Sequence, residues 1–531
     1  MSTKPSFLRL RGQKLIYAVT LTCSTGFLLF GYDLGFMGGL TTSNEFLDVF
    51  GHPNSALLGF LVSAYEIGAM FGAVFQFILG DRLGRRHNNM WGAGVVMIGA
   101  ILQASSFTRA QFIVGRLVGG FGLGTMTTVI PVWLAECSLP RSRGRMMAMQ
   151  LSNMIVGLIL ANWLDYGMEQ YPSTVSWRFP CAFQIIFCLI TIAVMPFLPE
   201  SPRYLITKGR MEEASYAMAA LRDGYPDSSH VANELKEIQY AVKVEEEESG
   251  SWSDIFKDNG VSGFQRMLVA FMANFFQQLS GVNVMSSLGP YVFERSVGLG
   301  QREALLVSGG LQVWYFLSSL LPWFLVDRCG RRTLFMVGSS GMFVCWLLSA
   351  IFEGVAGGGS GSFGRSNLGY GTAVVLYLFQ TFFTIGWQSN MWIYPSEMLP
   401  LRLRLRGASL AVVSQWLWTF LVVEITPTMI TNIGYKSYIV FAVINFLTVP
   451  YVYFFFPETS GMPLEAIDLL FADRDGKRPS IFRVVRESHQ KTYREQILQQ
   501  LHANAAREEV SEIIDAKPGG GEHVELRSAE P

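Results

Sequence analysis

The chain has 531 residues, of which 50% are hydrophobic and only 15% carry a charge. A soluble domain usually has about a quarter charged residues, so the composition argues against an ordinary soluble protein and predicts a large surface that faces lipid. Basic and acidic residues are balanced at 41 each, which gives no sign of a nucleic-acid partner. The six cysteines and six histidines show neither a disulfide framework nor the spacing of metal ligands.

Twelve apolar blocks follow one another along the chain, most of them close to the roughly 20 residues that cross a bilayer core. They lie near 15–38, 57–80, 90–108, 110–135, 146–167, 179–198, 265–290, 303–326, 333–353, 371–394, 407–430 and 437–456. The first block is too long for the apolar region of a signal peptide, so we expect it to remain as the first span. We therefore predict an all-α membrane protein with twelve transmembrane helices.

A polar stretch separates the sixth block from the seventh and divides the spans six and six. The predicted segments are a cytoplasmic N-terminus (1–14), a six-helix bundle (15–198), a cytoplasmic helical linker (199–264), a second six-helix bundle (265–456) and a partly disordered cytoplasmic tail (457–531). In the linker, Val231, Leu235, Ile238 and Val242 recur at helical spacing, which predicts an amphipathic helix.

Basic residues in the loops predict the orientation, because cytoplasmic loops carry an excess of lysine and arginine. One set of loops holds sixteen basic residues, and the opposite set holds six. The larger set comprises Lys4, Arg9, Arg11, Lys14, Arg82, Arg85, Arg86, Arg141, Arg143, Arg145, Arg328, Arg331, Arg332, Arg402, Arg404 and Arg406. We expect both termini, the linker and the tail on the cytoplasmic side.

Three motifs occur twice in the same order, once in each half, at offsets of 246, 261 and 258 residues. The paired motifs are Asp81 to Arg86 with Asp327 to Arg332, Glu136 and Arg143 with Glu397 and Arg406, and Glu200 with Glu458. Two similar halves are expected to pack around an axis along the membrane normal, with a binding site between them. We predict that Asp81, Arg85, Arg86, Glu136, Arg143, Glu200, Asp327, Arg331, Arg332, Glu397, Arg406 and Glu458 form a cytoplasmic gate. Its ion pairs would hold the halves together when the protein opens outward.

Asp33 in the first span and Arg116 in the fourth are ionisable groups inside apolar blocks. Such groups cost several kcal/mol in hydrocarbon unless they are paired or hydrated. Asp33 lies about 18 residues, or roughly 27 Å, from the inner start of its span, and Arg116 about 9 Å from the outer start of its own. Both fall in the outer half, so a pair is geometrically possible. Such a pair would be either a proton-coupling site, which we favour, or a permanent structural ion pair.

Three amides, Gln277, Gln278 and Asn283, lie within seven residues of the seventh span. Amides at that depth either join helices or bind a hydroxylated ligand through paired donors and acceptors. We favour the ligand, because three amides cluster beside Gly281. The glycines from Gly119 to Gly124 lie inside an apolar span, which favours close helix packing over a dinucleotide fingerprint.

These motifs together resemble the sugar porter family of the major facilitator superfamily, and its fungal members in particular, over residues 7–470. The motifs are Gly31-Tyr-Asp33, Gly80 to Arg86, Gly115-Arg116, Pro199 to Arg203, Gln277 to Gly281 with Asn283, Asp327 to Arg332 and Tyr394 to Glu397. The resemblance implies the major facilitator fold, with two pseudo-symmetric bundles that rock around one bound sugar. It implies that Asp33 marks proton symport and that Arg116 is its partner. It also implies that Gln277, Gln278, Asn283 and Trp392 contact the sugar.

Several positions depart from the family pattern. Gln150 stands one residue before the position that aligns with the glutamine of the fifth span, Asn390 lies in an altered tenth-span motif before Trp392, and Gln415-Trp416 replaces Asn-Trp in the eleventh span. The eighth span offers no asparagine between 303 and 326. Unpaired buried polar groups are costly, so these changes should alter which hydroxyl groups are recognised. The predicted binding set is Gln150, Gln277, Gln278, Asn283, Asn390, Trp392, Gln415 and Trp416.

The sequence therefore predicts a proton-coupled transporter of a sugar in a fungal plasma membrane, working as a monomer and driven by a proton gradient without any other cofactor. A polyol or a sugar acid remains an alternative substrate. A sugar sensor of transporter ancestry is the second hypothesis, because the altered pocket motifs also suit a receptor. An enzyme is disfavoured, since no catalytic constellation occurs in the sequence.

Overall fold

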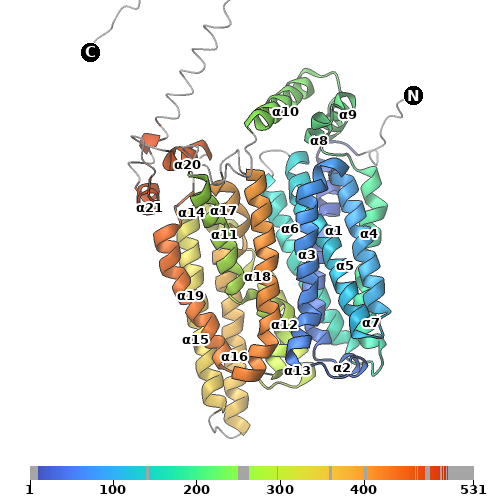
Figure 1. Cartoon of the computed structure of the whole chain (residues 1–531), viewed down its shortest axis with the longest axis vertical. Helices are drawn as coiled ribbons and strands as arrows, with labels where there is room; N and C mark the ends of the chain where they lie inside the picture. Colours follow the sequence, from blue (N-terminus) through green and yellow to red (C-terminus); the bar gives the residue numbers. More distant parts are fainter. Residues whose placement is uncertain are drawn as a thin grey trace, which may run out of the picture.

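The computed structural model describes residues 10–138, 143–248, 262–295, 297–357, 362–399, 404–460, 464–472 and 479–490, with isolated positions at 462, 493, 495–497 and 499. Every regular element in these ranges is a helix. Figure 1 shows long helices packed side by side, with the short helices of the linker and the tail at the end where the first helix begins. We call this the basic end, because Arg85–Arg86 and Arg331–Arg332 lie there, and the other the opposite end.

The first half contains six spans and one short helix, α2 (Asn44–Val49). The spans are α1 (Gly12–Leu40), α3 (Ser55–Leu83), α4 (Arg85–Ala104), α5 (Arg109–Cys137), α6 (Arg143–Met168) and α7 (Val175–Val194), the last followed by a short 3₁₀ turn, η1 (Met195–Phe197). Each begins and ends within a few residues of a predicted apolar block.

The second half also contains six spans, three of which are interrupted. The spans are α11 (Gly263–Leu279) with α12 (Val282–Arg295), α13 (Gln301–Ser318) with α14 (Pro322–Cys329), α15 (Arg331–Gly357), α16 (Ser362–Phe383) with the π-helix η3 (Thr384–Gln388) and α17 (Asn390–Met398), α18 (Arg404–Ile433), and α19 (Lys436–Phe455). Twelve spans in two halves match the predicted architecture.

Eight helices in the described ranges are long and apolar enough to cross a membrane by length and composition alone. They are α1, α3, α5, α7, α15, α16, α18 and α19. Two of the other four spans are broken, one at Gly281 with a φ of +94° and the other just before Pro322. The remaining two, α4 and α6, are continuous helices.

Helix contacts repeat between the halves. In the first half α1 packs on α6, α3 on α5 and α4 on α7; in the second, α11 packs on α18, α13 on α16 and α15 on α19. Between the halves, α3 meets α18, α6 meets α13, and α1 meets α12. If each helix is replaced by its counterpart in the other half, every contact named here becomes either itself or another contact of this set. The repeated motifs predict this symmetry.

Glycines set the closest helix approaches. A Cβ atom at Gly120 would lie 2.0 Å from the Tyr65 carbonyl oxygen, and one at Gly124 would lie 2.0 Å from that of Ala69. Small residues allow backbones to approach in this way in membranes, where no hydrophobic force drives helices together. The glycine run in α5 therefore packs α5 against α3, as its apolar context predicts.

The linker forms three helices at the basic end: α8 (Pro202–Thr207), α9 (Met211–Arg222) and α10 (Ser229–Glu248). Val231 and Leu235, from the predicted amphipathic pattern, pack with Ala214 and Met218 in a small core of their own. The tail contributes α20 (Leu464–Phe471) and α21 (Ile481–His489), which lie at the basic end of the second half, at the top of Figure 1.

Candidate functional site

A pocket lies between the two halves and is lined by side chains from both. The first half supplies Phe30 and Leu34 from α1 and Met154 and Leu158 from α6. The second half supplies Gln277, Gln278, Val282, Asn283, Ser286, Tyr315, Phe383, Gln388, Trp392, Gln415, Trp416 and Thr419. One wall is therefore apolar and the other carries most of the hydrogen-bonding groups. None of these described lining residues is acidic or basic at neutral pH. The one titratable side chain among them is the phenol of Tyr315, which is neutral at that pH.

The amides of the broken seventh span form one hydrogen-bonded cluster. The Gln278 amide nitrogen donates to the Gln277 side-chain oxygen at 2.8 Å, and the Asn283 amide donates to the Gln278 oxygen. The Thr419 hydroxyl of α18 also donates to the Gln278 oxygen at 3.0 Å. The break at Gly281 turns the chain so that Asn283 reaches back to Gln278. The cluster holds donors and acceptors in fixed directions, which suits recognition of hydroxyl groups.

Aromatic rings complete the pocket. Phe30 contacts Trp416 with ring centroids 5.3 Å apart, and Phe27, one turn toward the basic end, contacts Trp392 at 6.1 Å. These contacts join α1 to the second half. Flat rings suit the C–H faces of a sugar or polyol, and both Trp392 and Trp416 line the pocket.

Sequence reasoning missed four hydrogen-bonding residues of the pocket lining, which are Ser286, Tyr315, Gln388 and Thr419. The Tyr315 hydroxyl donates to the Gln388 side-chain oxygen across the pocket wall. Tyr315 comes from the eighth span, where only an asparagine was sought. Thr419 lies one helical turn from Gln415, and that spacing is a usable signal.

Two predicted residues, Gln150 and Asn390, lie outside the pocket lining. Gln150 is 1% exposed, and neither of its side-chain polar atoms has a hydrogen-bond partner among the described residues. Asn390 is also 1% exposed, and its amide donates to the Gly386 carbonyl oxygen at 2.8 Å. The π-helical turn η3 explains Asn390, because a wider turn shifts the helix register and brings Gln388 to the pocket instead.

Asp33 and Arg116 form the expected pair. One guanidinium nitrogen of Arg116 lies 3.0 Å from each Asp33 oxygen, and the other donates to the Val62 carbonyl oxygen at 2.7 Å. Arg116 also lies 4.4 Å from the centre of the Tyr65 ring. Asp33 is fully buried, and Arg116 is 1% exposed. The pair is thus sealed in this conformation by α1, α3 and α5.

The two halves touch near the opposite end. The Ser308 hydroxyl of α13 donates to the Asn162 side-chain oxygen of α6 at 2.8 Å, and the Ser63 hydroxyl of α3 donates to Glu424 of α18 at 2.6 Å. A Cβ atom at Gly38 of α1 would lie 2.9 Å from the Pro290 ring of α12. These contacts close the pocket toward the opposite end.

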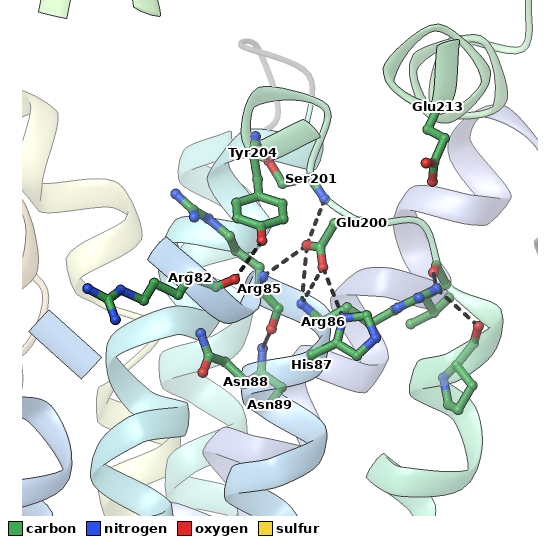
Figure 2. Close-up of polar contacts among 12 residues, drawn as sticks. Arg82, Arg85, Arg86, His87, Asn88, Asn89, Glu200, Ser201, Tyr204 and Glu213 are labelled. Carbon is green, nitrogen blue, oxygen red and sulfur yellow. Dashed lines mark hydrogen bonds and ion pairs between the residues drawn. The ribbon is translucent and has the colours of Figure 1, made fainter. Parts of the chain in front are cut away.

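In the first half, Glu200 caps the start of α4 at the basic end. Its carboxylate accepts hydrogen bonds from the backbone N–H groups of Arg85 at 3.0 Å and Arg86 at 3.1 Å, as Figure 2 shows. The Arg85 side chain pairs with Glu136 of α5 at 3.2 Å. A carboxylate at a helix N-terminus satisfies free N–H groups and interacts favourably with the helix dipole.

The second half repeats this arrangement. Glu458 accepts from the backbone N–H groups of Arg331 at 2.9 Å and Arg332 at 3.1 Å, and the Arg331 side chain lies 3.3 Å from Glu397. Thr459 donates to Glu397 at 2.5 Å. Burial raises the pKa of Glu397 above its ordinary value, although the Thr459 hydrogen bond and the Arg331 charge act in the other direction.

Each of these charge contacts joins helices of one half. In this conformation the described charged groups at the basic end therefore stabilise each half separately. Ion pairs that join the two halves in the outward-facing state stay a prediction. The side chains of four predicted gate residues, Asp81, Arg143, Asp327 and Arg406, lie outside the described residues.

Replacing Glu200 by Gln is expected to lower the free energy of unfolding by about 1–3 kcal/mol, because charged hydrogen bonds to two buried N–H groups become neutral ones. Thermal unfolding of the purified protein in detergent measures the change. Glu212→Gln is the matched control, since Glu212 is exposed on α9. Equal stability of the two variants would contradict the capping role.

Comparison with known proteins identifies the family. The family model "Sugar (and other) transporter" matches residues 18–471. The chain is 36% identical to the MFS-type transporter oryC of Aspergillus oryzae over 88% of this chain and 87% of that protein. It is 35% identical to the sugar transporter STL1 of Saccharomyces cerevisiae over 90% of this chain and 85% of that protein.

A solved structure has the same fold. The xylose transporter XylE from E. coli, in a partially occluded inward-open conformation, covers 85% of this chain and all of its own, with a TM-score of 0.71 and 24% identity. Further relatives carry the names of permeases and transporters, such as a quinate permease of Neurospora africana at 29% identity over 86% of this chain and 89% of that protein. The chain is a multi-pass membrane transporter and not an enzyme, and it belongs to the sugar transporter family of the major facilitator superfamily.

Proposed function

We propose that this chain carries a neutral sugar or polyol across the plasma membrane together with a proton, by alternating access of the pocket to the two sides. The observation that carries the proposal is the pocket between the halves, where the amide cluster around Gln278 faces the apolar side chains of α1 and α6. The basic end would face the cytoplasm, since its loops carry the excess of arginine.

The lack of charge on the described lining residues supports a neutral substrate over a sugar acid. A carboxylate buried in such a pocket would lose its hydration without gaining a cationic partner, which is strongly unfavourable. The relative from Neurospora africana is named a quinate permease, so an acid is the most important alternative substrate to test.

Proton coupling is supported by the buried Asp33–Arg116 pair. A carboxylate that is protonated gives up most of its attraction to arginine, and that loss would free α1 to move relative to α5. The pair lies in the first half, a short distance from the pocket residues Phe30 and Leu34 on the same helix.

Uptake in a transporter-deficient yeast tests the proposal, with labelled glucose, xylose, glycerol, mannitol and quinate offered singly and in competition. We expect one of the neutral compounds to be taken up, and a protonophore to abolish its accumulation. Preferred uptake of quinate would contradict the neutral substrate class. Binding of a neutral compound without uptake would instead identify a sensor.

Gln278→Ala is expected to raise the apparent KM of the best neutral substrate about tenfold or more, because losing the central amide leaves neighbouring polar groups unpaired at a cost of about 1–3 kcal/mol. Gln278 contacts Gln277, Asn283 and Thr419. The control is Gln239→Ala, since Gln239 is an exposed amide on α10. An unchanged KM in a well-folded Gln278 variant would remove the cluster from the binding site.

A further inference from the structure

A second buried carboxyl group lies beside the Asp33–Arg116 pair. Glu66 is near the middle of α3 and is 1% exposed. Its Oε2 atom is buried and has no hydrogen-bond partner among the described residues. Ionisable groups in such places are rare and mark functional sites by default. The function proposed above assigns Glu66 no role.

Glu66 lies on the face of α3 that connects the ion pair to the contact between the halves. Val62, Ser63 and Glu66 share this face, since residues three and four apart are neighbours on a helix. The Val62 carbonyl oxygen accepts a hydrogen bond from Arg116, and Ser63 donates to Glu424. Glu66 is thus about one turn, or roughly 5 Å, further along the same face.

The contact between α3 and α18, which we call the seam, belongs to the closed opposite end. A Cβ atom at Gly59 would lie 2.4 Å from the Glu424 carbonyl oxygen, so the two backbones are in close contact there. The charged groups that act on Glu66 come from three helices: Arg116 on α5, Asp33 on α1 and Glu424 on α18. Tyr65, its neighbour on α3, lies over Arg116.

The charge of one guanidinium acts on two buried carboxyl groups here. Arg116 contacts both oxygens of Asp33 and the Val62 carbonyl oxygen, whereas neither its Nε atom nor the Oε2 atom of Glu66 has a hydrogen-bond partner among the described residues. If both carboxyl groups were ionised, one negative charge would remain uncompensated at a buried site on which the charge of Glu424 also acts. That arrangement costs several kcal/mol, and a single bound proton removes the cost.

We propose that Glu66 is a second proton-binding group, which holds a proton while the seam is closed and releases it when α3 and α18 separate. Opening the seam would expose Glu66 to water and remove Glu424 from its surroundings. Both changes stabilise the ionised form of Glu66. The proton would pass between that water and the Glu66 carboxyl group, with no other reactant. The inference rests on the proposed proton-coupled function and adds to it a link between the ion pair and the seam.

The test uses the full-length protein reconstituted in liposomes, with the neutral compound that gives the largest uptake among glucose, xylose, glycerol and mannitol as the probe. Glu66→Gln mimics the protonated carboxyl group, and Glu66→Asp keeps an ionisable one. Two readouts are compared: counterflow exchange of labelled probe, which needs no net proton movement, and the pH dependence of net uptake. Glu45→Gln, in the short helix α2, is the control.

We expect Glu66→Gln to retain counterflow within a few-fold, to lower net uptake about tenfold, as one lost protonation step would, and to flatten its dependence on pH. Glu66→Asp should restore that dependence. A wild-type pH profile in Glu66→Gln, with coupling lost in Asp33→Asn, would overturn the inference and leave the proposed function standing. Equal loss of counterflow in both Glu66 variants, with normal folding, would also overturn it and assign Glu66 a structural role.

Net uptake by the wild-type protein that a protonophore does not reduce would have a different meaning. It would remove the proposed proton coupling as a whole, and with it the reason for a second proton-binding group. The two failures are therefore separable by the behaviour of the wild-type protein alone.

Discussion

Replacing Asp33 by Asn is expected to abolish accumulation of substrate against a gradient while leaving counterflow exchange measurable. Asn keeps the shape of the side chain but cannot bind or release the proton. In the structure Asp33 is buried and both of its oxygens lie 3.0 Å from Arg116. Accumulation should fall to the external concentration, a loss of about tenfold or more for a one-proton symporter at an ordinary proton-motive force.

Labelled uptake in yeast with and without a protonophore measures this effect. Asp48→Asn is the matched control, because Asp48 is a largely exposed acid (69%) in the short helix α2, where it pairs with His52. Undiminished accumulation in the Asp33 variant would show that the ion pair is structural. A folded yield far below the wild type would call for the double variant with Arg116→Gln, which removes the unpaired charge left behind.

Replacing Gly31 by Ala is expected to have the largest effect on folding. A Cβ atom at Gly31 would lie 1.7 Å from the Met154 carbonyl oxygen of α6, a backbone atom that cannot move aside. Helices α1 and α6 must then separate, and they carry the apolar wall of the pocket, Phe30 and Leu34 on one and Met154 and Leu158 on the other. Overpacking of a well-packed core costs about 1–3 kcal/mol or more.

Replacing Gly94 by Ala should not lower the stability of the protein. Gly94 lies in α4, and a Cβ atom there would meet no atom within 4 Å. Ala is favoured over Gly in a helix by about 1 kcal/mol, so Gly94→Ala should be neutral or stabilising. Size-exclusion profiles and thermal unfolding of both variants in detergent make the comparison. Equal stability would mean that α1 and α6 are not in such close contact.

Sequence reasoning succeeded where the signal is local or repeated. Length, hydropathy and recurring motifs predict the twelve blocks and the two halves. They also predict that Glu200 in the first half and Glu458 in the second occupy equivalent positions. Depth alone showed that a contact between Asp33 and Arg116 is possible, because the bilayer restricts each residue of a span to a known height, and the family resemblance implied that the two are partners. Both carboxylates at the basic end cap helices in the same way.

Sequence reasoning was weaker where the result depends on which way a helix faces. Successive helical residues point about 100° apart, so Gln150, one position from the aligned site, need not share its direction. The π-helical turn before Asn390 changes the register again. Tyr315 and Gln388 meet only because two different spans cross at the pocket.

What the sequence by itself determined was topology: where the chain crosses the membrane, which ends are basic, and that two similar halves enclose polar groups. These properties depend on the hydrophobic effect and on charge, which act on segments regardless of their neighbours. Only the tertiary structure decided which side chains share the pocket, and that Glu66 shares a face of α3 with the contacts to the ion pair and to α18. Such relations depend on helix rotation and close backbone contact, which no single segment encodes.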